Sequence, residues 1–297
     1  MLELSIIILN YKQKGLVKQC VRGILTSQPD LDYEIIVVDN NSNDGCLAAV
    51  EQLFSDFKSV TGTTTASFIT TKLPKLITIQ SDNNGGFAVG NNLGLAKAQG
   101  QYLLVLNPDI AIIPGVLEKM VNFMKQNSRV GVVSPKLINP DGSVQLSCRR
   151  FPDWRLPFYK RSVLGKLSWG RAATAKYLMV DFNHTETTAV DWLFGACLML
   201  RRELVEKIGM FDQRFFMYFE DLDLCRRAWH AGFYVYYFTA AEVVHYHQRL
   251  SAQRAGIFGL LKPAGRIHLM SGIKYFAKYL GVPVPKTSGL DKIVIFK

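Results

Sequence analysis

Carboxylates and histidines that could carry out chemistry occur at three places in the chain. Asp109 ends an Asn-Pro-Asp triplet, Glu220 and Asp221 are adjacent, and His245 and His247 follow further on. Carboxylate oxygens with an imidazole suit Mg²⁺ or Mn²⁺, particularly when a phosphate supplies further oxygen ligands. Each acidic residue also has a structural explanation as a turn or helix-capping residue. Considered together, the groups are better explained by one site for a nucleotide diphosphate.

The elements that must position these groups follow from hydrophobic patterning. The first half of the chain alternates short apolar segments with segments of helical spacing, which predicts an α/β protein. Strands this apolar are typical of a Rossmann-like, mostly parallel central sheet flanked by helices. The expected strands are Leu4–Leu9, Glu34–Val38, Leu76–Gln80, Tyr102–Leu106 and Val130–Ser134, and the expected helices are Lys14–Thr26, Gly45–Phe57, Phe87–Ala98 and Pro114–Gln126.

Polar residues follow four of the predicted strands at the point where each strand ends. Ligands of parallel sheets bind at the carboxyl ends of the strands. Any one polar cluster could be a turn or a helix cap, but four in succession indicate a shared polar cleft. The clusters are Asn10-Tyr11, Asp39–Ser42, Ser81–Gly86 and Asn107–Asp109.

The second half of the chain is less regular. A buried segment at Val190–Arg202 leads into a helix that ends at Gly209, and a second helix spans Leu222–Ala231. A strand at Tyr234–Phe238 is followed by the apolar segment Ala241–His247. These segments continue the α/β pattern and carry the second group of candidate catalytic residues.

The net charge of +11 is concentrated in two segments. Arg149–Lys176 holds eight basic residues against one acidic, and Gln248–Lys297 holds nine against one. A basic protein often binds nucleic acid, but these segments are rich in aromatic and aliphatic residues, which suits an anionic membrane surface. The predicted strands are buried, so no nucleic-acid partner is expected.

Two further segments have distinctive patterns. Arg266–Leu280 predicts a basic amphipathic helix, which could pack on the protein body or bind lipid. Ser59–Lys75 is rich in Thr and Ser and is predicted to be a surface insertion with no assigned chemistry. The apolar stripe of the helix consists of Leu269, Met270, Ile273, Phe276, Ala277 and Leu280.

Composition and motifs argue against several classes of protein. The hydrophobic share of 48% allows a sizeable core, and no apolar run is long enough to predict a membrane-spanning helix. The N-terminus does not resemble a signal peptide. Five widely spaced cysteines without a CxxC pair favour free thiols in a reducing compartment.

The glycine-rich segment NNGGFAVGNNLG could pass for a dinucleotide-binding loop. Its glycines lack the G-x-G-x-x-G spacing and follow the third predicted strand, so a hydride-transfer enzyme is a weak alternative. The sequence also lacks a P-loop motif and a G-x-S-x-G motif, which argues against a P-loop kinase and a serine hydrolase.

Seven segments follow one another in an order that is specific as a set. They are SIIILNYK, IIVVDNNSNDG, NNGGFAVGNNLG, LLVLNPD, VDWLFGACLMLRR, FDQRFFMYFEDLDLCRRA and VVHYH. In this order they resemble the family 2 inverting glycosyltransferases of the GT-A fold, and within them the bacterial rhamnosyltransferase-like branch. The similarity extends from about Leu4 to His247.

The resemblance implies that two groups of residues bind the donor. The first group is expected to hold the nucleotide and consists of Asn10, Tyr11 and Asp39. The second group is expected to line the donor pocket and consists of Asn84, Gly86, Phe87, Asn91 and Asn107.

The resemblance also implies a metal site and a general base. Asn107-Pro108-Asp109 stands where the family has an Asp-x-Asp motif, with Asn107 in place of the first Asp. Asp109 is expected to bind Mg²⁺ or Mn²⁺ on the donor diphosphate, and His245 is expected to complete the metal site. Asp221, in a catalytic pair with Glu220, matches the base that takes the proton of the attacking hydroxyl.

The expected protein is therefore a metal-dependent hexosyltransferase that transfers one sugar with inversion. dTDP-L-rhamnose is the expected donor, with UDP-galactofuranose or another UDP-sugar as the rival. A cell-surface glycan or a polyprenyl-linked glycolipid is the expected acceptor. A non-catalytic sugar-nucleotide-binding module is the competing class, and the intact Asp109, Asp221 and His245 argue against it.

The same interpretation predicts the domain boundaries of the chain and its location in the cell. Residues 1–247 would form the GT-A domain, with a nucleotide-binding half at 1–135 and an acceptor and catalytic-base half at 136–247. Residues 248–297 would form a basic helical extension. We expect a cytoplasmic protein, peripheral on the inner face of a bacterial membrane, held there by Arg149-Arg150, Phe158–Trp169 and Arg266–Leu280.

Overall fold

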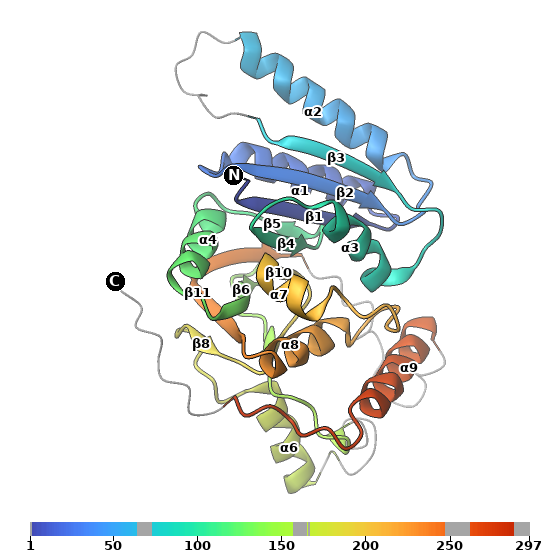
Figure 1. The fold of residues 1–297 in the computed structure, drawn as a ribbon, viewed down its shortest axis with the longest axis vertical. Helices are drawn as coiled ribbons and strands as arrows, with labels where there is room; N and C mark the ends of the chain where they lie inside the picture. Colours follow the sequence, from blue (N-terminus) through green and yellow to red (C-terminus); the bar gives the residue numbers. More distant parts are fainter. Residues whose placement is uncertain (1, 64–72, 157–164, 166, 247–261, 288–297) are drawn as a thin grey trace.

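The computed structural model describes residues 2–63, 73–156, 165, 167–246 and 262–287 (Figure 1). In the first half, four parallel strands alternate with helices, as predicted. The strands are β1 (Leu4–Asn10), β2 (Tyr33–Asp39), β3 (Lys75–Gln80) and β4 (Tyr102–Leu106), and the helices are α1 (Lys14–Ser27), α2 (Cys46–Thr63), α3 (Gly86–Lys97) and α4 (Val116–Gln126).

The second half extends the same sheet, whose strand order is β3-β2-β1-β4-β10-β6-β11-β5. The strand predicted at Val130–Ser134 is confirmed as part of β6 (Val130–Ile138), which runs parallel to β11 (Tyr234–His245). Between β4 and β6 lies β10 (Cys197–Arg201), which is antiparallel to both. The sheet is thus mixed but mostly parallel. The short strands are β5 (Ile110–Ala111), β7 (Cys148–Arg149), β8 (Thr188–Ala189) and β9 (Trp192–Leu193).

Helices cover both faces of this sheet (Figure 1). Ile6 and Ile8 of β1 pack in one apolar cluster with residues of α1, α2 and α4. Ile7 points to the opposite face, where its cluster includes residues of α3, of α7 (Arg202–Ile208) and of α8 (Glu220–His230). This two-sided burial explains why the strands are continuously apolar rather than alternating.

The glycines of α3 serve close packing of this helix on the sheet. A Cβ atom on Gly90 would lie 2.5 Å from a methyl carbon of Leu9, and one on Gly94 would lie 2.5 Å from a methyl carbon of Ile7. The helix can approach β1 this closely because the two residues lack side chains. Packing therefore accounts for this part of the glycine-rich segment.

The two predicted basic segments contain most of α6 (Ser168–Leu178) and all of α9 (Pro263–Lys278). Helix α9 packs on the protein body through Ser271 and Tyr275, which are buried. The predicted apolar stripe lies mostly on the other side of the helix, and its residues Leu269, Met270 and Ile273 are exposed. Within the described residues, no helix has the length and apolarity needed to cross a membrane.

Some predicted features lie partly or wholly outside the described residues. Residues 64–72 of the predicted insertion, most of Phe158–Trp169 and His247 belong to this group. Ser59 continues helix α2, and Lys75 begins β3. The division of the chain at residue 247 stays a prediction.

Candidate active site

The polar residues at the ends of β1 and β2 bind one another. Asn10 is fully buried, and its Nδ2 donates a hydrogen bond to Oδ1 of Asp39 at 2.8 Å. The same amide approaches Ser42 and Asp44 in the loop after β2, which fixes the two loops against each other. Tyr11 is 43% exposed. The structure thus brings Asn10 and Asp39 together at the edge of the sheet, and their contact with a nucleotide stays a prediction.

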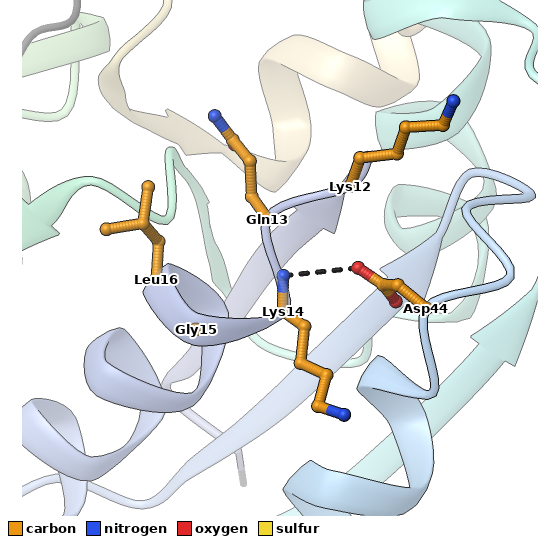
Figure 2. Close-up of a pocket in the computed structure, with 6 residues that line it drawn as sticks. All are labelled: Lys12, Gln13, Lys14, Gly15, Leu16 and Asp44. Atoms are coloured by element: carbon orange, nitrogen blue, oxygen red, sulfur yellow. Dashed lines mark hydrogen bonds between the residues drawn. The ribbon is translucent and has the colours of Figure 1, made fainter.

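An open cavity of about 540 Å³ adjoins these loops (Figure 2). It is lined by the start of α1 and by Asp44, whose Oδ2 accepts a hydrogen bond from the backbone N–H of Lys14 at 3.2 Å. The amines of Lys12 and Lys14 extend from its lining in different directions (Figure 2). The two amines favour anions at this rim, whereas the N–H of Lys14 at the start of α1 already donates to the Asp44 carboxylate.

The segment after β3 is fixed by contacts within the protein. Oδ1 of Asn84 accepts a hydrogen bond from Nδ2 of Asn40 at 2.8 Å. Gly86 has a φ of +83°, and a Cβ atom there would overlap the carbonyl oxygen of Phe216. That oxygen accepts a hydrogen bond from the N–H of Phe87 at 2.7 Å. These contacts join the start of α3 to the loop that precedes α8.

Two further predicted donor-pocket residues differ in their surroundings. Asn91 is buried in α3, where its Nδ2 donates to the carbonyl oxygen of Phe87 at 3.0 Å. The ring of Phe87 points toward Gly195. A Cβ atom on Gly195 would lie 3.4 Å from Cζ of Phe87 and 3.5 Å from Cβ of Asp221. The structure therefore places the Phe87 ring close to the predicted base.

Asp109 and His245 face each other beyond the end of β4. Strand β5 pairs with the end of β11 so that Ile110 lies opposite His245. Nε2 of His245 lies 3.4 Å from Oδ1 of Asp109, and the two side chains are 4% and 15% exposed. On the other side of the ring, Nδ1 lies 2.8 Å from Oε1 of Gln145. Nε2 of Gln145 donates to the carbonyl oxygen of His245 and to Asn139, so Oε1 must accept from Nδ1.

This arrangement fits a divalent cation. Because Oε1 of Gln145 accepts from Nδ1, Nε2 is the ring nitrogen that faces Asp109. Oδ1 of Asp109 is buried and accepts no hydrogen bond from the described residues. A cation at this position would be a partner for Oδ1 of Asp109, with Nε2 of His245 within reach. The described part of the chain contains no group of three or more His, Cys, Asp or Glu side chains suited to a metal, so phosphate oxygens and water would complete the coordination.

Asp221 lies in the first turn of α8 and is held by two backbone groups. Its Oδ2 accepts a hydrogen bond from the N–H of Gly195 at 2.9 Å, and its Oδ1 accepts one from the N–H of Leu222 at 2.8 Å. Both oxygens are thereby oriented by the main chain rather than by flexible side chains. The carboxylate has the fixed geometry that a general base requires.

The turn before α8 has an unusual backbone and is held from α9. Tyr218 and Phe219 both lie in the left-handed region, with φ of 69° and 71°. Non-glycine residues adopt this conformation at an energetic cost, which the surrounding structure must offset. Ser271 of α9 donates to the carbonyl oxygen of Met217 at 2.9 Å, and the rings of Phe219 and Tyr275 lie 5.5 Å apart.

Burial changes the protonation of the acidic pair. Desolvation raises the pKa of Asp221 to about 6, although the N–H groups of Gly195 and Leu222 and the charge of Arg149 act in the opposite direction. Glu220 is more deeply buried, and burial together with the charge of Asp221 raises the pKa of Glu220 well above its usual range. Asp221 can therefore take up and release a proton near neutral pH, whereas a catalytic role for Glu220 stays a prediction.

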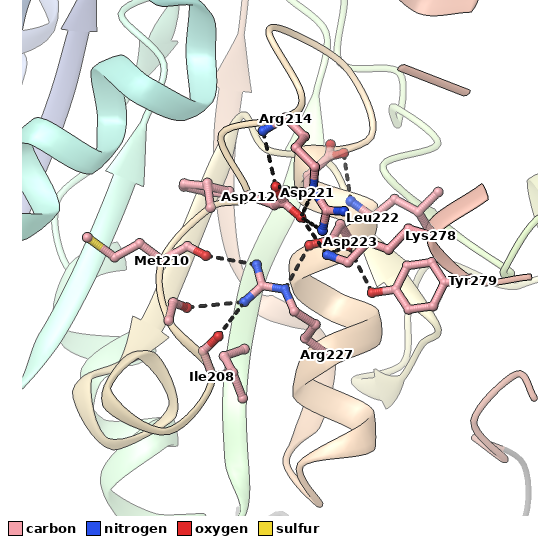
Figure 3. Close-up of polar contacts among 12 residues, drawn as sticks. Ile208, Met210, Asp212, Arg214, Asp221, Leu222, Asp223, Arg227, Lys278 and Tyr279 are labelled. Atoms are coloured by element: carbon pink, nitrogen blue, oxygen red, sulfur yellow. Dashed lines mark hydrogen bonds and ion pairs between the residues drawn. The ribbon is translucent and has the colours of Figure 1, made fainter. Parts of the chain in front are cut away.

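An ionic network ties α8 to α9 (Figure 3). Asp223 is fully buried and accepts hydrogen bonds from Nε of Arg227 at 2.7 Å and from the hydroxyl of Tyr279 at 2.8 Å. Lys278 forms an ion pair with Asp223 and another with Asp212 at 2.7 Å. The helix that carries Asp221 is therefore fixed from the C-terminal side of the chain.

The adjacent ends of β4 and β10 connect the metal position to the base. The N–H of Asn107, at the end of β4, donates to the carbonyl oxygen of Ala196 at 2.8 Å. Gly195, the residue before Ala196, donates to Asp221. Asp109 lies two residues beyond Asn107. The predicted metal ligand and the predicted base are thus placed by one pair of strands.

Three residues with contacts in this site were not predicted for it. Gly195 lies within the motif VDWLFGACLMLRR, and a glycine next to a buried strand is a signal for close backbone approach. Gln145 carries no such signal. Arg149 was predicted to contact lipid, but its guanidinium lies 5.4 Å from the ring centroid of Tyr177 and 4.7 Å from that of Phe194.

A mostly parallel sheet that is flanked by helices and carries polar residues at its strand ends matches the GT-A fold. A mannosyltransferase from Pyrobaculum calidifontis, solved with GDP-mannose and Mn²⁺, has this fold with a TM-score of 0.54 and 16% identity. The similarity covers 95% of this chain and 76% of that one.

Sequence comparison gives the family. Residues 5–209 match the model of glycosyl transferase family 2, and the chain belongs to that family. An N-acetylglucosaminyl-diphospho-decaprenol L-rhamnosyltransferase from Mycobacterium tuberculosis is 31% identical over 236 residues, which cover 75% of this chain and 69% of the relative. A rhamnosyltransferase from Escherichia coli is 28% identical over 65% of this chain and 70% of its own length.

Proposed function

We propose that this glycosyltransferase transfers one sugar, with inversion, from a nucleotide-sugar donor to a hydroxyl group of a glycan or a polyprenyl-linked glycolipid. The observation that carries the proposal is Asp221, a carboxylate with a pKa of about 6 that is fixed by Gly195. Inversion by direct displacement needs a base at the acceptor hydroxyl and a stabilised leaving group. The proposal is supported by the adjacent strand ends that lead to Asp109 and to Gly195, the residue that holds Asp221.

In the proposed reaction, Asp221 takes the proton of the acceptor hydroxyl while that oxygen attacks the anomeric carbon. The bond from the anomeric carbon to the nucleoside diphosphate breaks in the same step, so the configuration inverts. Asp109 and His245 would hold Mg²⁺ or Mn²⁺, which when bound neutralises the charge that develops on the leaving diphosphate. Gln145 accepts a hydrogen bond from Nδ1 of His245 and would thereby keep Nε2 available to a bound cation.

The proposed donor is dTDP-L-rhamnose, which is supported by the two relatives named as rhamnosyltransferases. UDP-galactofuranose or another UDP-sugar is the rival. Thermal unfolding of the purified protein with dTDP-, UDP- and GDP-sugars, each with and without Mg²⁺, distinguishes them because a ligand of the folded state raises the Tm. We expect the largest rise with dTDP-rhamnose. A larger rise with a UDP-sugar would identify that sugar nucleotide as the donor instead of dTDP-rhamnose. No rise in Tm with any of them would contradict the proposed function.

The proposed acceptor places the enzyme at a membrane, on its cytoplasmic face. A relative is named for an acceptor that carries a decaprenyl diphosphate. On α9, Leu269, Met270 and Ile273 are exposed together with Arg266, as is Lys262 directly before the helix. Apolar side chains beside cationic ones on an exposed helix suit insertion at the surface of an anionic bilayer.

Flotation with phosphatidylglycerol-containing liposomes tests this attachment. We expect the wild-type chain to float at low salt, and the triple variant Leu269→Ser, Met270→Ser, Ile273→Ser to lose most of this binding. Val144→Ser with Val180→Ser is the matched control, because both valines are exposed but lie outside α9. A wild-type chain that stays at the bottom at low salt would contradict membrane attachment.

A further inference from the structure

Arg149 has a buried cationic group that the proposed reaction does not use. The residue lies on β7, where it pairs with Trp192 of β9. Its guanidinium lies over the rings of Phe194 and Tyr177, and its Nη1 is buried without a hydrogen-bond partner among the described residues. A buried guanidinium that leaves a donor unpaired is costly, because each N–H loses its bonds to water.

The position of this guanidinium relates it to the base. Phe194, on whose ring it lies, directly precedes Gly195, which donates to Asp221. The charge of Arg149 favours the ionised form of Asp221, and the Asp221 carboxylate in turn favours the charged form of Arg149. A cation with an unused donor, Nη1, thus lies near the carboxylate that takes the acceptor proton.

The neighbours of Arg149 indicate that its guanidinium would bind the acceptor rather than the donor. Its ring contacts come from Tyr177 on α6 and from Phe194, both in the second half of the chain. The donor diphosphate is assigned to Asp109 and His245, which meet where β5 pairs with the end of β11. Arg149 is therefore placed to meet an anionic group of the molecule whose hydroxyl Asp221 deprotonates.

We propose that Arg149 binds a phosphate oxygen of the acceptor's diphosphate and so selects acceptors that carry a sugar on a diphosphate. The planar guanidinium offers several N–H donors in a fixed fork that matches phosphate geometry. The rings of Phe194 and Tyr177 hold its plane, so little side-chain entropy is lost on binding. In an acceptor with one sugar, that sugar ring alone separates the attacking hydroxyl from the phosphate. This inference rests on the proposed transfer reaction.

The neighbouring Arg150 provides a control. Its Nη1 donates to Oδ1 of Asp191 at 3.2 Å, and its side chain is 42% exposed. Arg150→Met therefore removes the same charge one residue along the chain from a group that already has a partner. In Arg149→Met, the methionine side chain is close to the aliphatic part of arginine in length and apolar character. The packing on Phe194 and Tyr177 is therefore largely kept.

The experiment compares two acceptors at pH 8.5, where Asp221 is ionised in each variant. One is N-acetylglucosaminyl diphosphate on a short prenyl chain, and the other is the same sugar as an uncharged alkyl glycoside. We expect Arg149→Met to raise KM roughly 10- to 100-fold for the diphosphate acceptor only, as for one charge-assisted hydrogen bond. Arg149→Lys should recover part of the loss, and Arg150→Met should keep the wild-type ratio of the two KM values.

Other outcomes would overturn the proposal. An equal loss with both acceptors, together with a shifted pH profile, would show that Arg149 acts only on the ionisation of Asp221. A weakened donor Kd with unchanged acceptor KM would assign the guanidinium to the donor diphosphate. If Arg149→Met does not fold, the ratio of the two KM values in Arg149→Lys serves instead, and a wild-type ratio would contradict the proposal.

A binding measurement separates this inference from the reaction itself. Calorimetric titration with the prenyl diphosphate sugar needs no turnover, so it remains informative if the wild type transfers no sugar. We expect the wild type to bind this probe at least tenfold more tightly than Arg149→Met does. Equal affinities would overturn the role of Arg149 whether or not transfer is observed.

Discussion

The backbone N–H of Gly195 donates a 2.9 Å hydrogen bond to Oδ2 of Asp221. Gly195 lies just before β10, and Ala196 in turn accepts a hydrogen bond from Asn107 at the end of β4. The turn that leads into β10 thus orients Asp221, the proposed base. Because the start of β10 pairs with the end of β4 in the central sheet, the proposed base and the proposed metal position lie near adjacent strand ends.

Asp221→Asn should abolish transfer while leaving donor binding nearly intact. The amide oxygen can still accept from Gly195, although the amide nitrogen cannot replace the oxygen that accepts from Leu222, and the group that takes the proton is lost. We expect the turnover rate to fall about 10²- to 10⁴-fold, as for loss of a general base. Initial rates and a calorimetric titration with donor measure the two effects. Retained activity would place the base elsewhere.

The rate should depend on pH through the ionisation of Asp221. Burial raises the pKa of this carboxyl to about 6, so the active, ionised form predominates above pH 6 and is lost below it. We expect kcat/KM to fall about tenfold for each pH unit below that value and to level off toward pH 8. A profile that remains flat down to pH 4.5 would contradict Asp221 as the base, provided that unfolding is excluded by circular dichroism at each pH.

Much of the fold was predictable because hydrophobic periodicity encodes it. The strands ending at Asn10 and Asp39 have continuous apolar runs, and the helices between them have clear helical spacing. The position of β10 was not predictable, because strand order depends on contacts between distant segments. Gln145 was also missed, since its role depends on its hydrogen bond to His245, a hundred residues away.

Gln145→Leu should weaken metal binding without removing a ligand. The variant loses the acceptor of the Nδ1 proton of His245, so the ring is free to change tautomer and orientation. We expect the apparent affinity for Mn²⁺ to fall about 10- to 100-fold, measured as donor affinity during a Mn²⁺ titration. Saturating Mn²⁺ should restore most of the activity, and a loss that is independent of Mn²⁺ would contradict this role.

Asp109→Ala should instead remove the dependence of donor binding on the metal.

Gly86→Ala should destabilise the protein more than Gly142→Ala, although both glycines have a φ of +83°. For Gly142, nothing lies within 4 Å of the added Cβ, so the cost is the left-handed conformation alone, about 1–2 kcal/mol. For Gly86, the added Cβ also overlaps the carbonyl oxygen of Phe216, which must move. We expect a total loss of about 2–5 kcal/mol in the free energy of unfolding.

Urea denaturation of both variants measures this difference, and their activities add a second readout. Phe216 lies in the loop that leads to Asp221, so displacing its carbonyl should also misplace the base. We therefore expect the folded Gly86→Ala protein to lose activity, while the Gly142→Ala protein keeps the wild-type rate. Equal losses of stability and activity in the two variants would mean that the Gly86–Phe216 contact does not position the catalytic helix.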